Sequence, residues 1–245
     1  EGSATSGLSN YAELFADSRK WVKEGWVDYI NPQIYFTFTR RVAPFGTLVD
    51  WWSNNSYGRH VYIGQGAYLV NSRAEAAWKN LSEVPRQVRY LRESNRIQGS
   101  VYFSSKSLST VARSVADSLR NDLYKYQALP PQMPWLDEVP PNEPQALTVD
   151  ALKDGVHLKW QNPLKAKDGE TASGFVIYRF AEGEKISTLD PKNILKISFE
   201  DYLSFIDTTV EAGKRYSYLV TALDRLKNES EPSGSVGVEI PLAKE

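Results

Sequence analysis

Six prolines lie between positions 130 and 144 and divide the sequence into two parts with different patterns. Proline lacks a backbone N–H and fixes φ, so prolines at this density stop both helices and central strands. We therefore interpret residues 126–144 as a stiff connector. Its segment 133–136, Met-Pro-Trp-Leu, is too apolar to remain in solvent. We expect Trp135 to pack on the part of the chain that precedes it.

Residues 1–125 alternate between helical and strand patterns. Strands are predicted at residues 26–36, 60–70 and 97–105, and helices at about 10–25, 44–54, after Ser82 and 109–123. Strand–helix units imply a parallel sheet with helical cover. A closed (β/α)8 barrel needs eight strands. Three strands therefore leave two alternatives, a small open sheet or the C-terminal part of a barrel whose first part lies outside this chain.

Local signals support these helices. The capping-box spacing of Asn10 and Glu13 predicts the first helix start, and Gly25 is a natural stop. The apolar stripes expected to be buried are Tyr11, Leu14, Phe15, Trp21 and Val22, then Val84, Val88 and Leu91, then Val111, Val115 and Leu119. Trp51 and Trp52 are adjacent on a helix, so they point about 100° apart. We favour core packing for this pair over sugar stacking.

Alternate side chains of a barrel strand face the helices or the inside. In the first strand Ile30, Ile34 and Phe36 form the helix-facing set, which leaves Asn31, Gln33 and Tyr35 inside. In the second, Val61 and Ile63 face outward, and Tyr62, Gly64, Gly66 and Tyr68 inward. In the third, we assign Val101 and Phe103 to the outer face and Ser100, Tyr102 and Ser104 to the inner face.

Barrel enzymes place their chemistry at the carboxyl ends of the strands. The inner side chains nearest that end are the candidate substrate-binding residues, namely Gln33, Tyr35, Tyr68, Tyr102 and Ser104. Amides and phenols can bond sugar hydroxyls, and aromatic rings can stack on the apolar faces of sugars. The alternative is plain packing, in which these side chains fill barrel layers.

We predict no catalytic residue in this chain. Glycosidases usually need two carboxylates that flank the bond, and no predicted strand ends in one. Asp28 starts its strand, Asp50 lies on a helix, and Glu75, Glu83 and Glu93 fall in a segment interpreted as a solvated face. The two histidines, His60 and His157, are isolated and cysteine is absent, so we predict no metal site and no cofactor.

Composition limits the partners and the compartment. The formal net charge is −1 and the cations are scattered, so nucleic acid is not an expected partner. No run of eighteen apolar residues spans a membrane. The chain starts Glu-Gly-Ser without Met, which we interpret as a processed chain or a piece of a longer one.

Residues 145–245 contain only short strand patterns. The predicted strands are residues 146–152, 155–161, 174–180, 194–198, 204–207, 215–224 and 235–240. Seven strands over about a hundred residues indicate a β-sandwich. Trp160 suits an inter-sheet core, and Tyr216 suits a tyrosine corner. With Tyr178-Arg179 and the run 216–224, this half resembles a fibronectin type III module.

The first half resembles the C-terminal part of glycosyl-hydrolase-like family ten, a group of bacterial TIM-barrel proteins. The resemblance covers residues 14–21, 24–35, 51–52, 62–64, 86–87 and 128–135, and Asp28-Tyr-Ile-Asn-Pro-Gln-Ile-Tyr35 is its most specific part. The resemblance implies a cell-envelope protein, in several members a lipoprotein, and in one branch cleavage of peptide-free peptidoglycan glycan strands. A fibronectin-like domain after the barrel also fits that family. The catalytic acids would lie on earlier strands, so the three strands here would correspond to barrel strands six, seven and eight.

Two functions remain open. The first is a C-terminal fragment of a glycoside hydrolase of the bacterial cell envelope (periplasm or outer-membrane lipoprotein) or a secreted one, which contributes a substrate-binding wall. The second is a non-catalytic carbohydrate-binding or scaffolding protein. Under both functions, the expected domains of the chain are a partial barrel over 1–125, the connector 126–144 packed on that barrel, and a fibronectin type III-like domain over 145–245. Because a partial barrel exposes two strand edges, we also expect self-association.

Overall fold

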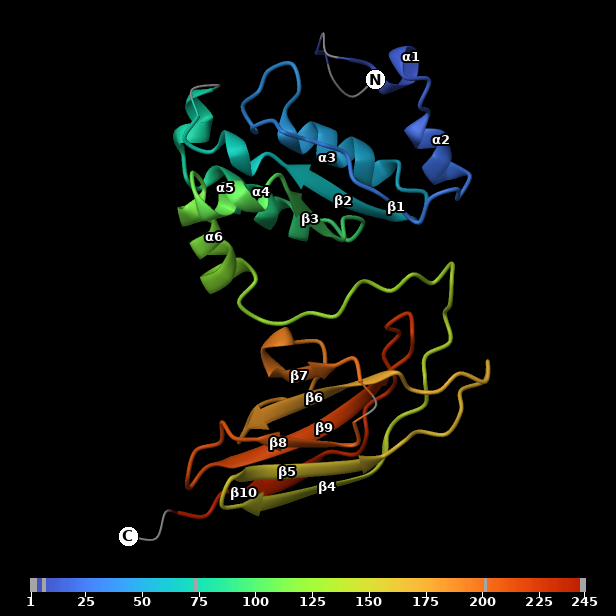
Figure 1. Cartoon of the computed structure of the whole chain (residues 1–245), viewed down its shortest axis with the longest axis vertical. Coiled ribbons are helices and arrows are strands. Elements are labelled where there is room, and N and C mark those ends of the chain that lie inside the picture. Colours follow the sequence, from blue (N-terminus) through green and yellow to red (C-terminus); the bar gives the residue numbers. More distant parts are fainter. Residues whose placement is uncertain (1–3, 6–7, 73–74, 201, 243–245) are drawn as a thin grey trace. The chain divides into compact units, whose positions relative to one another are not determined.

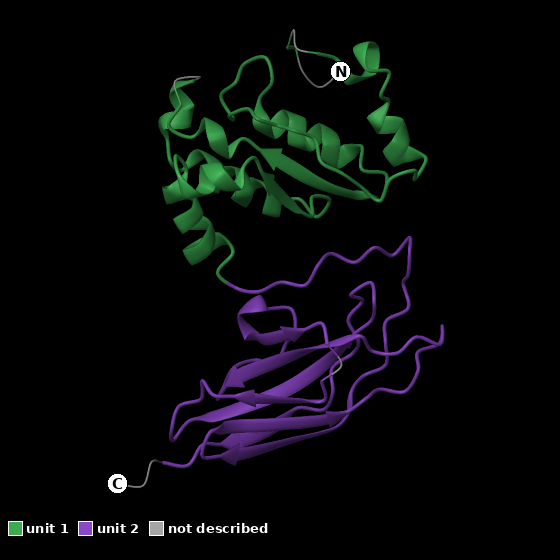
Figure 2. Ribbon diagram, viewed as in Figure 1, with its two compact units in different colours: residues 1–125 green, residues 126–245 purple. Residues whose placement is uncertain are grey.

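The computed structural model describes residues 4–5, 8–72, 75–200 and 202–242. The chain forms two compact units, residues 1–125 and residues 126–245 (Figures 1 and 2). No helix among the described residues is long and apolar enough to cross a membrane.

The first unit contains a three-stranded parallel sheet in the order β1-β2-β3 (Figure 1). The strands are β1 (Tyr29–Ile30), β2 (His60–Gln65) and β3 (Gly99–Tyr102). Beyond β1 the pairing continues through a bridge between Gln33 and Gly64. The predicted parallel sheet is therefore present, and its first strand is shorter than the pattern indicated.

Helices follow each strand. The helix α3 (Phe45–Asn54) follows β1, and α4 (Glu83–Arg92) follows β2 after the short 3₁₀ helices η1 (Ala67–Leu69) and η2 (Ala76–Lys79). After β3 the chain forms α5 (Ser105–Ser109), α6 (Arg113–Ser118) and the π-helical turn η3 (Leu119–Leu123). The strand–helix alternation matches the prediction, because the apolar spacing that defines each element is local.

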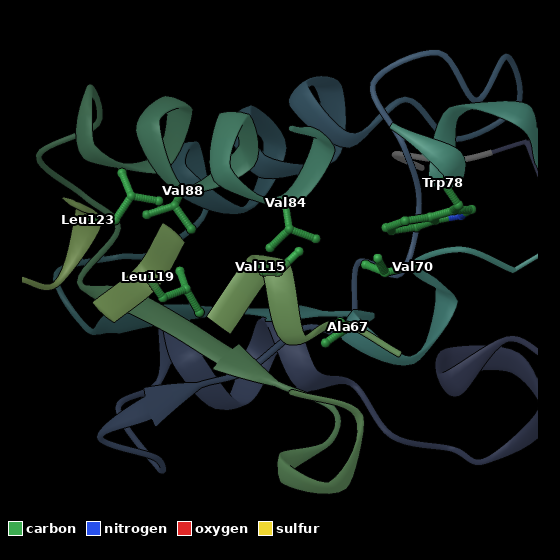
Figure 3. Packing of buried hydrophobic residues seen from close by; sticks show 9 residues of the cluster. Ala67, Val70, Trp78, Val84, Val88, Val115, Leu119 and Leu123 are labelled. Atoms are coloured by element: carbon green, nitrogen blue, oxygen red, sulfur yellow. The ribbon is translucent and has the colours of Figure 1, made fainter. Parts of the chain in front are cut away.

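Apolar side chains from the sheet and the helices form two buried clusters. Val61 and Ile63 of β2 pack with Ile34, Phe45 and Val49 in one of them. The other joins α4 to α6, and Figure 3 shows Val84 and Val88 directed toward Val115 and Leu119. These contacts confirm the helix-facing sets predicted for the first two strands. Val111 is an exception, because its side chain is 49% exposed.

The first predicted helix is broken in two, α1 (Asn10–Glu13) and α2 (Ser18–Lys23). Ser9, rather than Asn10, caps α1 by accepting a hydrogen bond from the Ala12 N–H at 3.1 Å. Asp17 caps α2 in the same way, and such local side-chain bonds compete with a continuous helix. Consequently only Val22 of the predicted stripe is buried, while Phe15 is 89% exposed.

The second unit is a sandwich of two antiparallel sheets, with strand orders β4-β5-β8 and β10-β9-β6-β7. Its strands are β4 (Gln145–Leu152), β5 (Gly155–Gln161), β6 (Gly174–Ala181), β7 (Ile194–Ser198), β8 (Ser204–Asp207), β9 (Arg215–Leu223) and β10 (Val236–Glu239), with the 3₁₀ helix η4 (Pro191–Asn193) before β7. Trp160 packs edge-on against Phe175, with ring centroids 5.4 Å apart. The Tyr216 hydroxyl accepts a hydrogen bond from the Glu211 N–H at 3.3 Å. The predicted sandwich, with its core tryptophan and its tyrosine corner, is thus confirmed.

The connector contacts the sandwich. Leu129 packs against the buried cluster that contains Tyr178 and Leu219. The Asp137 carbonyl accepts a hydrogen bond from the Asn228 side-chain amide at 3.2 Å. Packing of Trp135 on the first unit stays a prediction.

Candidate functional site

Three aromatic rings meet at the carboxyl ends of the three parallel strands. Tyr35 lies beyond β1, Tyr68 lies in η1 directly after β2, and Phe103 follows β3. Ring centroids are 5.8 Å apart for Tyr35–Tyr68, 6.2 Å for Tyr35–Phe103 and 5.7 Å for Tyr68–Phe103. We call these residues the ring cluster. Tyr68 is 43% exposed and Phe103 57% exposed, so the cluster presents aromatic surface to solvent.

The backbone around the ring cluster fixes its members. The Tyr68 N–H donates to the Phe103 carbonyl at 3.1 Å, which ties η1 to the end of β3. A Cβ atom on Gly66 would lie 3.2 Å from the Tyr35 Cβ. Glycine therefore allows Tyr35 to lie close against the chain at this position. Burial, with a smaller contribution from Tyr68, raises the pKa of Tyr35, so its hydroxyl stays protonated at neutral pH and can donate to a ligand.

Gln33 lies on the same face of the sheet as Tyr35, two residues earlier along the strand. Its backbone pairs with Gly64, while its side chain is exposed. Among the described residues, the side-chain amide of Gln33 has no hydrogen-bond partner. Of the predicted candidates, Tyr35 and Tyr68 are thus in contact, and Gln33 lies on the same face of the sheet as Tyr35.

The third strand has the opposite orientation from the one predicted. Its register pairs Val101 with Gly64 and Tyr102 with Gln65. Tyr102 therefore shares the helix-facing side, where it packs against the cluster between α4 and α6. Its hydroxyl lies 3.1 Å from the Tyr124 hydroxyl, and burial, more than any other effect, raises the pKa of Tyr102.

The open face carries Phe103 instead. The prediction assumed that apolar residues face the helices, and this sheet places apolar and aromatic residues on both faces. Phe103 was missed for that reason. The sequence of the strand itself carries no signal for this orientation, because it is set by the register with β2, in which Tyr102 pairs with Gln65.

Ser104 begins α5 rather than extending the inner face. It is the N-cap residue, and its hydroxyl lies 3.3 Å from the Ser107 hydroxyl. Among the described residues, no hydrogen bond joins Ser104 to the ring cluster. Ser104 is thus the residue at which α5 starts, and it is not part of the ring cluster.

Two acidic residues interpreted as part of a solvated face are instead engaged in the fold. Glu83 is only 2% exposed, and its carboxylate accepts the Phe38 N–H at 2.9 Å and an Arg86 N–H at 2.9 Å. Glu75 pairs with Arg40 at 2.7 Å and accepts the Thr37 hydroxyl at 2.9 Å. Thr37, Phe38 and Arg40 lie in the loop between β1 and α3, so helical spacing alone could not reveal these contacts.

Exposed cations also lie in the segments that follow the first and third strands. Arg41 is in the loop after β1, and Lys106 is in α5 directly after β3. Both side chains are exposed and have no ion-pair partner among the described residues. The carboxylate of Glu75, which lies in the loop after β2, is neutralised by Arg40. Among the described residues that follow the strands, Arg41 and Lys106 therefore carry positive charge without an ion-pair partner.

The tryptophan pair lies elsewhere in the unit. Trp51 and Trp52 meet edge-on, with ring centroids 5.0 Å apart. Trp52 packs against the cluster of α3 and the sheet. Trp51 lines an open groove together with Tyr11 of α1 and Arg19 of α2. The core role favoured for the pair is confirmed for Trp52.

Among the described residues, one group of carboxylates could approach a metal ion. Asp137, Asp168 and Glu170 have ligand atoms within 4.8 Å of one another. Glu170 already accepts a hydrogen bond from Arg225 at 2.6 Å, and Asp168 is exposed at the surface. We assign no metal to this group.

Comparison with protein families gives a match over residues 3–80. The matching family is glycosyl hydrolase-like 10. The matched residues include the segment 28–35, and with it Gln33 and Tyr35, and they also include Tyr68.

Two curated bacterial proteins are similar in sequence to this chain. The glycosyl hydrolase YngK of Bacillus subtilis is 41% identical over 231 residues, which cover 93% of this chain and 44% of that protein. The glycosyl hydrolase DigH of Escherichia coli K12 is 40% identical over 88 residues, 34% of this chain and 20% of that protein. The chain thus spans less than half the length of these curated relatives.

Solved structures match about two fifths of the chain. An Fn3-like protein from Clostridium thermocellum is 19% identical, with a TM-score of 0.31, over 43% of this chain and 98% of that protein. The FN5 domain of Drosophila Lar is 23% identical, with a TM-score of 0.30, over 41% of this chain and 97% of that domain. The sandwich itself is established by the two sheets described above.

Proposed function

We propose that this chain forms part of a glycoside hydrolase and supplies one wall of the glycan site. The chain belongs to the glycosyl hydrolase-like 10 family through residues 3–80. A fibronectin type III-like domain follows that part of the chain. The proposed wall consists of Gln33 and the ring cluster. The single observation that carries the proposal is the convergence of the three rings at the carboxyl ends of three parallel strands.

The chemistry of this wall suits a sugar. Aromatic rings offer stacking surface to the C–H faces of a pyranose, and the Tyr35 hydroxyl and the Gln33 amide can bond sugar hydroxyls. Parallel strands place such groups at one edge, where barrel enzymes bind substrate. We leave Tyr102 and Ser104 out of the wall, because their side chains are engaged with Tyr124 and Ser107.

The three strand–helix units are proposed to be the last three of a (β/α)8 barrel. A three-stranded parallel sheet leaves an edge open at β1 and another at β3. Barrel closure needs five more strands, and the relatives are more than twice as long as the matched segment. The catalytic carboxylates would then belong to a longer polypeptide and not to residues 4–242.

The proposed substrate is a peptidoglycan-type glycan of the bacterial cell envelope. Such strands carry carboxylate groups, and the exposed Arg41 and Lys106, in the segments that follow β1 and β3, offer charge of the opposite sign. The corresponding location is the cell envelope, as a periplasmic protein or an outer-membrane lipoprotein, or outside the cell.

A binding experiment tests the wall. Isothermal titration with peptide-free peptidoglycan oligosaccharides would compare the parent chain with Gln33→Ala and Tyr35→Ala. Tyr11→Ala is the matched control, because Tyr11 is 70% exposed on α1 and lies outside the ring cluster. We expect both wall variants to bind about fivefold more weakly than the parent. Equal affinity for all four proteins would refute the assignment.

A genetic observation separates the enzyme from a non-catalytic carbohydrate-binding or scaffolding protein. The reading frame upstream of residue 1 should encode further strands that end in Asp and Glu. A start codon immediately before Glu1 would favour the binding or scaffolding protein instead.

A further inference from the structure

The segment that directly follows Tyr35 is held by side chains from a distant stretch of sequence. The Phe36 carbonyl accepts a hydrogen bond from Gln87 Nε2 at 3.0 Å. The Phe38 N–H donates to Glu83 at 2.9 Å. Glu75 binds the Thr37 hydroxyl and Arg40, as described above. Residues 36–40 are therefore fixed at four points by three side chains, Glu75, Glu83 and Gln87, which we call the rim clamp.

The rim clamp is itself connected and enclosed. Gln87 Nε2 also donates to Glu83 at 3.2 Å, and Gln87 accepts a hydrogen bond from Gln65 of β2 at 3.3 Å. Gln65 and Gln87 are fully buried. A buried and connected set of this kind resists rearrangement, because each group that loses its partner costs desolvation free energy.

Aromatic packing adds to the restraint on the same segment. The Phe38 ring packs edge-on against Phe45 of α3 and Tyr90 of α4, with centroid distances of 5.1 Å and 5.4 Å. The Arg86 guanidinium lies 4.5 Å from the centroid of the Phe38 ring. These contacts of Phe38 hold the segment against both α3 and α4.

We infer that Glu75, Glu83 and Gln87 are positioning residues for the glycan site. They fix the backbone that continues from Tyr35 and thereby hold the Tyr35 ring in the ring cluster. The role of these residues in glycan binding rests on the proposed function. The positioning of Tyr35 itself rests on the contacts of residues 36–40. None of the three residues is expected to touch the glycan, because Glu83 and Gln87 are buried and both oxygens of Glu75 are occupied.

The variant Glu83→Gln breaks the clamp with little change in volume. One of the two carboxylate oxygens becomes an NH2 group, so that either the Phe38 N–H or Arg86 meets a donor in place of an acceptor. Glu75→Gln is a second, less buried variant that keeps a partner for Thr37 and removes the charge facing Arg40. Glu93→Gln is the control, because Glu93 is exposed at the far end of α4.

The first measurement is independent of glycan. In the full chain labelled with 3-fluorotyrosine, the ¹⁹F resonance of Tyr35 is assigned by its loss in Tyr35→Phe. We expect this resonance to shift and broaden in Glu83→Gln and Glu75→Gln and to stay unchanged in Glu93→Gln. An unchanged Tyr35 resonance in the clamp variants overturns the inference, whether or not the chain binds glycan. If Glu83→Gln does not fold, Glu75→Gln decides the question alone.

The second measurement is glycan affinity. We expect the clamp variants to bind peptide-free peptidoglycan oligosaccharides about tenfold more weakly, because small misplacements of a binding group are costly. In a Tyr35→Ala background the same substitutions should have no further effect. A loss that persists in that background would contradict a role through Tyr35. Absence of binding by the parent chain would refute the proposed function. The ¹⁹F measurement would still show whether the rim clamp positions Tyr35.

Discussion

The rings of Tyr35 and Phe103 lie with centroids 6.2 Å apart and planes inclined by 29°, close to parallel. Tyr68 meets both rings edge-on. The two stacked residues follow the first and third strands of the sheet, and Tyr68 lies in η1 after the middle strand. An aromatic surface has therefore been assembled from three separate strand ends, and its parts are close only because the strands are parallel and in register.

Phe103 and Tyr102 are adjacent and face opposite sides of the sheet, so their substitutions should differ in kind. We predict that Phe103→Ala weakens glycan binding about fivefold and leaves stability nearly unchanged, because its ring is exposed. Tyr102→Ala should cost about 3 kcal/mol of unfolding free energy. Titration calorimetry and chemical unfolding of the full chain would check this. The reverse pattern would place Tyr102 in the site and Phe103 in the core.

Gly64 is expected to be intolerant of a side chain. A Cβ atom there would lie 3.1 Å from the Asn31 Oδ1, the Pro32 carbonyl oxygen and the Gln33 Cα. We predict that Gly64→Ala lowers the unfolding free energy by about 1–2 kcal/mol, because the neighbouring backbone must move. Gly234→Ala, which has open space around it, is the control and should be neutral. Comparable unfolding midpoints for the two variants would contradict the prediction.

Asp207 should make the stability of the sandwich dependent on pH. Burial by itself would raise the pKa of Asp207, but hydrogen bonds from Thr209, Tyr218 and Arg179 outweigh it, and the pKa is lowered. A lowered pKa in the folded state means that the ionised carboxylate stabilises the fold above the unfolded-state pKa. This contribution is lost as the pH falls through the folded-state pKa.

We therefore predict that Asp207→Asn costs about 3 kcal/mol at neutral pH. The difference from the parent should shrink as the pH is lowered into the acid range. Urea unfolding at a series of pH values would measure it, with the exposed Asp150→Asn as the control. A difference that stays constant with pH would assign the cost to packing rather than to the charge.

The open edges of the sheet predict association of the isolated chain. Val101 lies on β3, an edge strand, and is 44% exposed on the open face. We expect the parent to self-associate with rising concentration in light scattering, and Val101→Lys to reduce this association, since an edge lysine opposes strand pairing. Val111→Lys, outside the sheet and 49% exposed, should behave as the parent. A monodisperse parent monomer at all concentrations would contradict the prediction.

The chain by itself is predicted to cleave no glycan. Two carboxylates of the segment that follows β2 are engaged in ion pairs, Glu75 with Arg40 and Glu83 with Arg86. Retaining and inverting mechanisms need two carboxylates that flank the bond. Incubation with peptide-free glycan strands should release no reducing ends. Sustained release by the purified chain would mean that it carries its own catalytic pair.

Much of the fold could be predicted because its signals are local. The helices α3 and α4, the three parallel strands and the seven strands of the sandwich follow from apolar spacing and turn residues, which depend on neighbours in sequence. The prediction for the first helix was wrong, because the hydrogen bonds made by the Ser9 and Asp17 side chains were not weighed.

The candidate site was predicted in part. Gln33, Tyr35 and Tyr68 lie on the expected face, since the apolar Ile34, Val61 and Ile63 fix the orientation of the first two strands. The orientation of the third strand could not be read in the same way. A shift by one residue exchanges its faces, and both of its faces carry large side chains.

The sequence by itself determined the order of helices and strands, the division at the proline-rich connector and the family to which the first part belongs. Only the tertiary structure decided that Phe103 rather than Tyr102 joins Tyr35, and that Glu83 is buried against Phe38. The physical reason is the range of the interactions. Periodicity is a property of neighbouring residues, whereas strand register and the burial of a carboxylate depend on partners that lie far away in the chain.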